Sequence, residues 1–425
     1  MQSIVGNHNL IMASKIILRD IRVNGSIVEY QFFVSEGLRK FFTTDKFFVQ
    51  YEQSVENVPI SILSIPFVNC MAGISWLSDA ILFVDEIDST YYEAFKQIKR
   101  AYSELHKTQL KGMFVPSIIK RNVIAESSDY LLLFGGGVDC HSSFLRNKER
   151  ISGVINIYGW LKKLSDDDNV DAADRLNTKL FAQQFGIKGH HIRSNFASQF
   201  NNKAIDRDYC SNLGTSYWYG FLHPMAFLSI ATPLAWAESI SNLMIASSFT
   251  KERIDVHCGS LITTDSEYRF AANGNAIHDG FELNRQEKVK ILVEYQKSQN
   301  KPYLIQACSF NDHNCCECEK CFRTIVELIA EGANPKDFGF DIEGSIRSHW
   351  EHIVRRDVGL WGVSKENYYY YYYARQRMQE NYDNIYDKEF VDWFLGFDFD
   401  RAKKAGLRRY YRQNFFSIIK RKLHI

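Results

Sequence analysis

The pattern of apolar and polar positions changes near residue 125. Before that point, alternating or β-branched and aromatic runs cover 14–18, 27–34 and 41–51, as is typical of strands. Two further apolar runs, 60–67 and 80–84, continue this part of the chain. A helix is expected next, because Tyr91, Phe95, Ile98 and Tyr102 fall at helical spacing. These elements predict an N-terminal α+β domain.

After residue 125, short continuous apolar runs alternate with amphipathic segments, which favours a parallel sheet covered on both faces. The expected strands are 130–134, 153–158, 190–192, 243–247 and 303–308, and the expected helices are 170–184, 224–239 and 286–296. The chain becomes polar, aromatic and helical after about 335. We therefore expect an α/β protein with an N-terminal α+β domain (1–122), a parallel-sheet domain (123–335) and a mainly helical C-terminal region (336–425).

One uncharged stretch, Trp218–Ala237, is long enough to span a bilayer. It contains Pro224 and Pro233 and lies between charged segments. We favour a buried helix over membrane contact, and expect no transmembrane segment. The N-terminus has no basic residues before its apolar stretch, so no secretory signal is expected and a reducing, cytoplasmic location is inferred.

The near-neutral charge is an average of two unlike parts. The 425 residues include 51 Lys or Arg and 50 Asp or Glu, a formal +1. Nine of the basic residues and no acidic residue lie in 401–425, which leaves residues 1–400 at a formal −8. The simplest role for this basic tail is docking on the acidic body, with RNA or an anionic membrane surface as alternatives.

A glycine-rich turn follows the first predicted strand of the central region, with the sequence Phe134-Gly-Gly-Gly-Val-Asp-Cys140. Converging backbone N–H groups and a helix N-terminus would cradle an anion, most often phosphate. A carboxylate such as Asp139 beside that cradle would hold Mg²⁺. The alternative is a tight strand-to-helix turn with Asp139 at the helix start. The sequence matches neither the dinucleotide fingerprint nor the Walker loop.

A cysteine cluster lies near residue 310. Cys308, Cys315, Cys318 and Cys321 supply four thiolates with two C-x2-C spacings, which favour tetrahedral zinc over an iron–sulfur cluster or free thiols. Four protein ligands leave no open coordination position, so the zinc would be structural.

The glycine turn resembles the S-G-G-x-D-S loop of the PP-loop ATP pyrophosphatase superfamily. Gly136, Gly137 and Asp139 match in register, whereas Gly135 and Cys140 replace the two serines whose hydroxyls help to bind pyrophosphate. Together with the cysteine spacing and the stretch 314–324, the chain resembles the 7-cyano-7-deazaguanine synthase branch, over roughly 128–330. Longer relatives of this branch occur beside polysaccharide-synthesis and phage-defence genes.

The resemblance implies an adenine nucleotide alpha hydrolase-like fold and assigns roles to particular residues. ATP would bind the loop from Gly135 through Val138 to Cys140, with Tyr158 near the adenine and Ser247 and Ser248 at a strand end. Arg285 would contact phosphates from the start of a helix that has a capping box, and Asp139 would hold Mg²⁺.

Four further residues are candidate substrate contacts. Ser260 and Asp265 lie in a segment that resembles a substrate loop of the longer relatives. His278 and Asp279 are a candidate acid–base pair, although a single histidine is more often structural. Plain turns remain the alternative for Tyr158, Ser247 and Ser248, and a solvated helix start for Arg285.

The resemblance implies an ATP-dependent ligase that adenylates a carboxylate-like substrate, releases pyrophosphate and passes the acyl group to nitrogen. One alternative is a nucleotide-binding, catalytically weakened subunit of a larger complex, and another is a tRNA-modifying enzyme. The acceptor would be a small molecule or a macromolecule. The tyrosine run 368–373 suggests a protein partner, a domain interface or a homo-oligomer contact, because its side chains cannot all face one side of a helix.

Overall fold

The structure is a computed structural model that describes residues 14–160, 168–253, 257–308, 311–356, 365–413 and 415. The chain forms two compact units. The first comprises residues 1–135 and 146–282, and the second comprises 136–145 and 283–425. These units do not follow the boundaries expected at 122 and 335.

The central strands of the first unit form the parallel part of a mixed α/β sheet. They are β6 (Tyr130–Leu133), β7 (Ile151–Tyr158), β8 (Lys188–Ser194), β9 (Asn242–Ala246) and β11 (Gly274–Asp279). Their spatial order is β11-β9-β6-β7-β8, and each neighbouring pair is parallel. The short β10 (Arg269–Ala271) adds an antiparallel edge to β11.

The N-terminal strands continue the same sheet. They are β1 (Lys15–Asn24), β2 (Ile27–Val34), β3 (Lys46–Gln50), β4 (Ile81–Asp88) and β5 (Met113–Lys120). In the described chain the sheet has eleven strands, and β3 joins β8 through the antiparallel partners Val49↔Ser194 and Gln50↔Arg193. One sheet therefore runs through both regions that the sequence suggested were separate domains.

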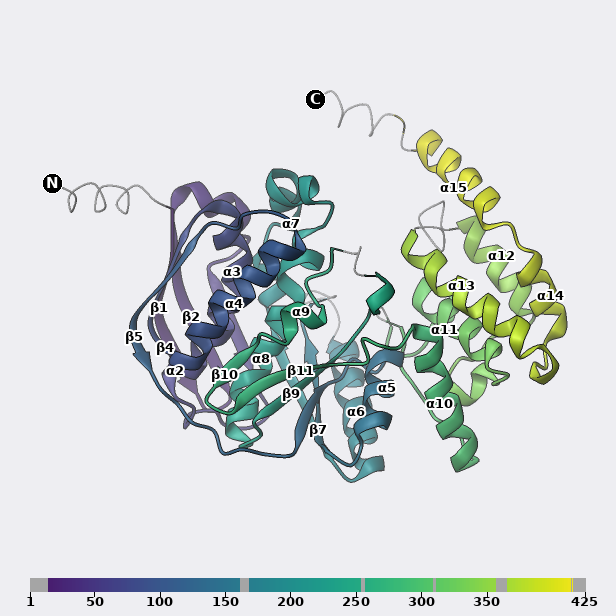
Figure 1. Ribbon diagram of the computed structural model, residues 1–425, viewed down its shortest axis with the longest axis horizontal. Helices are drawn as coiled ribbons and strands as arrows, with labels where there is room; N and C mark the ends of the chain where they lie inside the picture. The colour runs from purple at the N-terminus through teal and green to yellow at the C-terminus, as the bar shows by residue number, and fades with distance from the viewer. Residues whose placement is uncertain are drawn as a thin grey trace. The chain divides into compact units, whose positions relative to one another are not determined.

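Helices cover this sheet. Among the N-terminal strands, α2 (Ile60–Leu63), α3 (Ile65–Ser78) and α4 (Ser89–Leu105) pack on one face (Figure 1). The central strands pack against α6 (Asp168–Phe185) and α8 (His223–Ala237). The short α7 (Asn202–Ile205) and α9 (Ile262–Asp265) occupy connections. The apolar run 60–67, which continued the strand-rich pattern in the sequence, is therefore helical.

In the described chain, one helical stretch passes a length and composition test for a membrane span. It is Ile60–Ser78, and 89% of its 18-residue window is buried inside the molecule. The uncharged stretch that the sequence singled out instead forms a π-helical turn, Trp218–Leu222, followed by α8. Eleven of the fifteen residues of α8 are buried, as expected for a core helix.

The second unit is helical where it is described. It contains α5 (Val138–Asn147, which ends in the first unit), α10 (Arg285–Gln299), α11 (Glu319–Ala330), α12 (Ile346–Arg356), α13 (Lys365–Glu380), α14 (Lys388–Gly396) and α15 (Phe399–Gln413). Trp350 is buried among aromatic rings, including those of Phe322 at 4.3 Å and Tyr371 at 5.3 Å between centroids. This aromatic cluster packs α12 and α13 onto α11.

Two sequence predictions in the second unit have different outcomes. The strand expected at 303–308 is wrong. In the described chain, Tyr303 N–H donates to Asp337 O and Ile305 N–H to Phe338 O in the turn after α11, and Gln306 N–H donates to Gly136 O. The tyrosine run is divided as expected: Tyr371 is fully buried on α13, whereas Tyr372 is 54% exposed.

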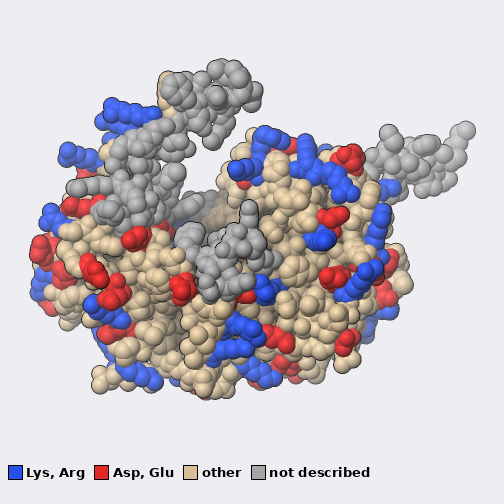
Figure 2. All heavy atoms as spheres, turned by 180° about the vertical axis from the view of Figure 1, so that it is seen from behind, with Lys and Arg blue, Asp and Glu red and all other residues tan. Residues whose placement is uncertain are grey.

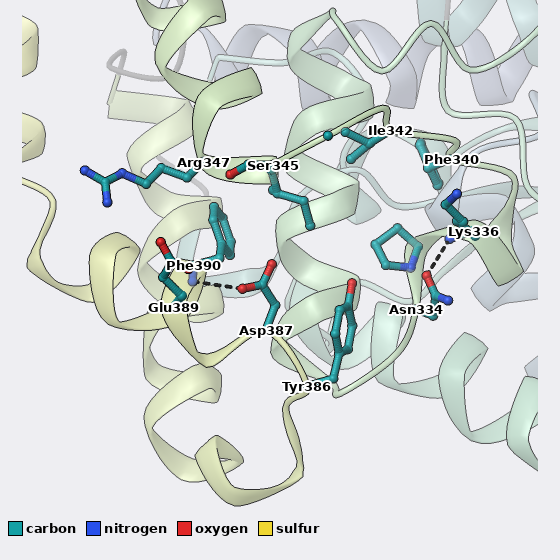
Figure 3. A pocket seen from close by; sticks show the side chains of 13 residues that line it. Asn334, Lys336, Phe340, Ile342, Ser345, Arg347, Tyr386, Asp387, Glu389 and Phe390 are labelled. Atoms are coloured by element: carbon teal, nitrogen blue, oxygen red, sulfur yellow. Dashed lines mark hydrogen bonds between the residues drawn. The ribbon is translucent and has the colours of Figure 1, made fainter.

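Figure 2 shows acidic and basic side chains interspersed over the face in view. In the basic tail, the described side chains of Arg401, Lys404, Arg408 and Arg412 are exposed. The last ten residues lie outside the described chain.

Candidate functional site

The glycine turn has the conformation of a strand-to-helix loop. It follows β6 directly, and α5 begins at Val138. Gly136 has φ +75°, and a Cβ there would lie 3.0 Å from Gln306 Cβ, so only glycine fits this position. Gly135 and Gly137 have open space on the side where a Cβ would be. The Cys140 thiol donates to Gly137 O at 3.1 Å.

The order of the central strands places the end of β6 at a switch point. The chain moves from β6 outward through β7 to β8, and then returns to β9 on the other side of β6. Ligands of open parallel sheets bind beyond the carboxyl ends of the strands at such points. Gly135 follows β6 there, and Ser247 and Ser248 follow β9.

The residues expected at these strand ends differ in exposure. Ser248 is exposed, but Ser247 is buried, and its hydroxyl donates to Phe249 O at 2.5 Å. Tyr158 at the end of β7 is 5% exposed and lies beside His191. Ser248 is therefore the member of this set that is open to a ligand from solvent.

Asp139 lies in the first turn of α5 and meets two cations from α10. Arg285 Nη1 lies 3.1 Å from Asp139 Oδ2, and Lys288 Nζ lies 3.4 Å from Oδ1. Burial raises the pKa of the Asp139 carboxyl, but the charges of Lys288 and Arg285 outweigh this and hold the pKa below its usual value. A metal ion that bound Asp139 would have to compete with both cations.

Arg285 is fixed by two further bonds to α11. Its Nε donates to Glu327 Oε2 at 3.0 Å and its Nη2 donates to Thr324 Oγ1 at 3.2 Å. Asn284 caps α10 and Glu287 completes the expected capping box. Arg285 is only 8% exposed, so it does not lie on a solvated helix start.

The Glu327 carboxyl is fully buried, and burial raises its pKa to about 7 despite the opposing charges of Arg285 and Arg323. In the sequence, nothing marked Glu327 or Lys288. Their spacing could have indicated them. Lys288 lies one helical turn after Arg285, and Glu327 lies one turn after Thr324, so the two residues of each pair share a helix face.

We expect Glu327 to make stability fall as pH rises. Its pKa is about 7 in the folded state against 4.5 unperturbed. The folded chain therefore holds this proton when the unfolded chain has lost it. The contribution is fully present below pH 4.5 and is lost by pH 7, with a magnitude on the order of 2–3 kcal/mol.

Denaturant unfolding between pH 5 and 8 would measure this effect, and Glu327→Gln should flatten the slope. The matched control is Glu294→Gln, because Glu294 is 64% exposed on α10 and should leave the slope unchanged. An unaltered slope in Glu327→Gln would contradict the assignment.

The four predicted metal-ligating cysteines converge. Their sulfur atoms all lie within 4.8 Å of one another, with Cys308 and Cys315 at 3.6 Å and Cys315 and Cys321 at 3.9 Å. These separations are too long for disulfides, and none of the four cysteines forms one in the described chain. Zinc with bonds of about 2.3 Å would hold tetrahedral sulfurs about 3.8 Å apart. The cluster can therefore hold a metal ion such as zinc.

The local backbone builds this cluster. The Asn314 side chain accepts from Ala307 N–H and Cys308 N–H and donates to Ile305 O, so it clamps the segment before the cluster. Cys318 caps α11, where its sulfur accepts from Cys321 N–H at 3.5 Å. Cys316 takes the left-handed conformation (φ +55°) and lies outside the set of four.

The candidate substrate residues of the first unit divide into two groups. Ser260 Oγ donates to Asp265 Oδ2 at 2.8 Å, and His278 Nδ1 lies 2.9 Å from the same oxygen. Asp279 is not part of this network, since Arg146 and Asn147 contact its carboxylate. His278 and Asp279 are therefore not an acid–base pair, because they contact different partners.

The network around Asp265 joins Ser260 and His278 through one carboxylate oxygen. The Ser260 hydroxyl donates to the Asp265 carboxylate and not to the His278 imidazole, so the three side chains do not form the serine–histidine–carboxylate order of a nucleophilic triad. The side chains of Asp265 and His278 are almost fully buried. The described geometry suits a rigid support for the loop 258–265.

Comparisons of the chain with protein-family models, with curated proteins and with solved structures find no match.

Proposed function

We propose that the protein is a PP-loop ATP-dependent ligase. It would adenylate a carboxylate-like substrate, release pyrophosphate, and pass the acyl group to a nitrogen nucleophile. The observation that carries the proposal is the glycine turn that leads into α5, whose first turn holds Asp139 against Arg285 and Lys288.

The reaction needs positioning and charge neutralisation more than covalent chemistry. A substrate carboxylate oxygen attacks the α-phosphorus of ATP, and the bond from that phosphorus to the bridging oxygen breaks as pyrophosphate leaves. The nitrogen nucleophile then attacks the acyl carbon, AMP leaves, and the nitrogen loses a proton. Arg285 and Lys288 would neutralise the phosphate charge.

Asp139 would carry Mg²⁺, which fits its chemistry as a carboxylate beside a phosphate cradle. Mg²⁺ would supply charge neutralisation for the departing pyrophosphate. In the described structure both oxygens of Asp139 face cations. A bound phosphate would compete with Asp139 for the N–H groups of Arg285 and Lys288, which would leave the Asp139 oxygens available to Mg²⁺.

The decisive experiment measures ATP binding, and pyrophosphate release with a panel of carboxylic acids. Asp139→Ala should abolish release, whereas Asp279→Ala should not. A second candidate, a nucleotide-binding subunit without turnover, is favoured by the missing hydroxyls at 135 and 140 and by the paired state of Asp139. Tight ATP binding with no pyrophosphate from any acid would select it.

We expect Gly135→Ser with Cys140→Ser to tighten ATP binding. Gly135 has open space for a side chain, and a serine hydroxyl at 140 can rotate from the Gly137 O contact that the thiol makes and donate to phosphate instead. Each hydroxyl that reaches phosphate adds about 0.5–1.5 kcal/mol, so calorimetry should show roughly 5- to 150-fold higher affinity for the pair.

The control for this gain is Gly135→Ala, which adds bulk at the same position without a hydroxyl. Equal affinity in the serine pair and the alanine variant would show that phosphate does not reach the turn. That result would count against the proposed nucleotide site.

A further inference from the structure

The tyrosine run reaches the Arg285 cluster from α13. The ring centroid of Tyr370 lies 4.0 Å from the guanidinium carbon of Arg323 and 5.8 Å from that of Arg285. Tyr370 and both arginines are each 8% exposed. An aromatic face that meets buried guanidinium groups at these distances attracts them, because the ring face is electron-rich.

The ring is held in place by its own helix. Arg377 Nε, two turns further along α13, donates to both oxygens of Glu331 at 3.0 and 2.9 Å, and Asn381 Nδ2 donates to Ala330 O at 3.0 Å. Gln286 of α10 contacts the same Glu331 at 2.9 Å. The helices α10, α11 and α13 therefore share one anchor, and Tyr370 has little freedom to move.

Arg323 retains donor capacity. Arg323 Nη1 pairs with Glu319 at 3.3 Å. Its Nε is buried and has no hydrogen-bond partner in the described chain. Stacking on a ring uses the face of a guanidinium and leaves its in-plane N–H groups free for an anion. Arg285, Lys288 and Arg323 thus form a cationic group whose orientation depends on the ring.

We propose that Tyr370 is a positioning residue that orients Arg323 and Arg285 for a multiply charged phosphate group. The helical C-terminal region, which lies outside the resemblance to PP-loop enzymes, is then part of the anion site and not a separate module. This inference rests on the proposed function, since that function supplies phosphate as the ligand.

The test uses the full-length chain and sodium pyrophosphate as the probe. Tyr370→Leu should weaken pyrophosphate binding in calorimetry by about 5- to 30-fold, as expected for a desolvated cation–π contact. Tyr370→Phe keeps the ring and should stay within about 3-fold of the wild type, since only the hydroxyl is lost. Tyr372→Leu, an exposed neighbour on α13, should bind like the wild type.

A second readout separates positioning from general stability. In the ligand-free protein, the Arg323 side-chain NMR signals should show a ring-current shift that Tyr370→Phe keeps and Tyr370→Leu loses. An unshifted wild-type signal, or equal pyrophosphate affinity in the leucine variant and the wild type, would overturn the inference.

The experiment distinguishes failure of the proposed function from failure of this inference. If the wild type binds pyrophosphate in a Tyr370-dependent way but does not bind ATP, the anion site stands and the ligase proposal does not. If ATP binds but Tyr370→Leu changes nothing, the ligase proposal stands and the positioning role does not. A wild type that binds neither probe overturns both.

Discussion

Replacing Cys318 with serine should release the bound metal and lower the free energy of unfolding by on the order of 5 kcal/mol. The reason is that the four thiolates are brought together only in the folded chain, so the free energy of zinc binding adds to the free energy of folding. Serine can still cap α11 in place of the Cys318 sulfur, so the change isolates the metal ligand. Without a metal, contacts with Cys308 and Cys318 and burial raise the pKa of the Cys321 thiol.

The measurement is elemental analysis with thermal unfolding. The wild type should contain about one zinc per chain, since the cluster has one tetrahedral set of ligands. Cys316→Ser is the matched control, because its sulfur lies outside the set of four, and it should keep the metal. A stably folded wild type without metal would contradict the zinc assignment.

Loss of zinc should also weaken the anion cluster. Cys318 and Cys321 lie at the start of α11, and Thr324 and Glu327 further along the same helix hold Arg285. Nucleotide or pyrophosphate affinity should therefore fall in Cys318→Ser together with the metal content.

Arg285→Met should have the second large effect, a loss of about 3–5 kcal/mol of stability at pH 8, because it leaves buried carboxylates without their partner. Glu327 is fully buried, and Lys288 is the partner that Asp139 keeps among the ion pairs of the described chain. Methionine has similar length but no charge. Denaturant unfolding measures the loss, and calorimetry should show that pyrophosphate binding disappears.

The pH dependence identifies the cause. Because the pKa of Glu327 is about 7, its protonated form needs no cation, and the destabilisation should shrink near pH 5. Adding Glu327→Leu should recover part of the lost stability, since it removes the unpaired charge. If Arg285→Met lowered the free energy of unfolding by less than about 1 kcal/mol, the ion pair between Arg285 and Glu327 would not contribute to stability as a buried pair should.

The sequence predicted the parts of the fold that have a distinct local pattern. The apolar residues of β6 are followed by glycines, and those of β7 come after a length of chain that suits one helix, so the sequence predicts both strands. The helix α3 was not recognised, because it is buried on nearly all sides and has no polar face to show a helical period. The segment 303–308 is apolar like a strand, but it pairs with a turn.

The parts of the candidate site that could be predicted are those formed by residues close together in the sequence. The four cysteines and the glycine turn are local patterns, and the cysteines converge as expected. The partners of Asp139 and Arg285 could not be predicted in the same way. Glu327 lies 42 residues from Arg285 and Tyr370 comes from a different helix, so only tertiary packing brings them together.

The junction between β3 and β8 has a consequence for synthesis. Val49 pairs with Ser194, so the edge of β3 has no sheet partner until some 145 residues more have left the ribosome. An unpaired strand edge is a template for association with other chains. The nascent N-terminal segment would therefore need protection during translation, and a fragment truncated before β8 would tend to aggregate.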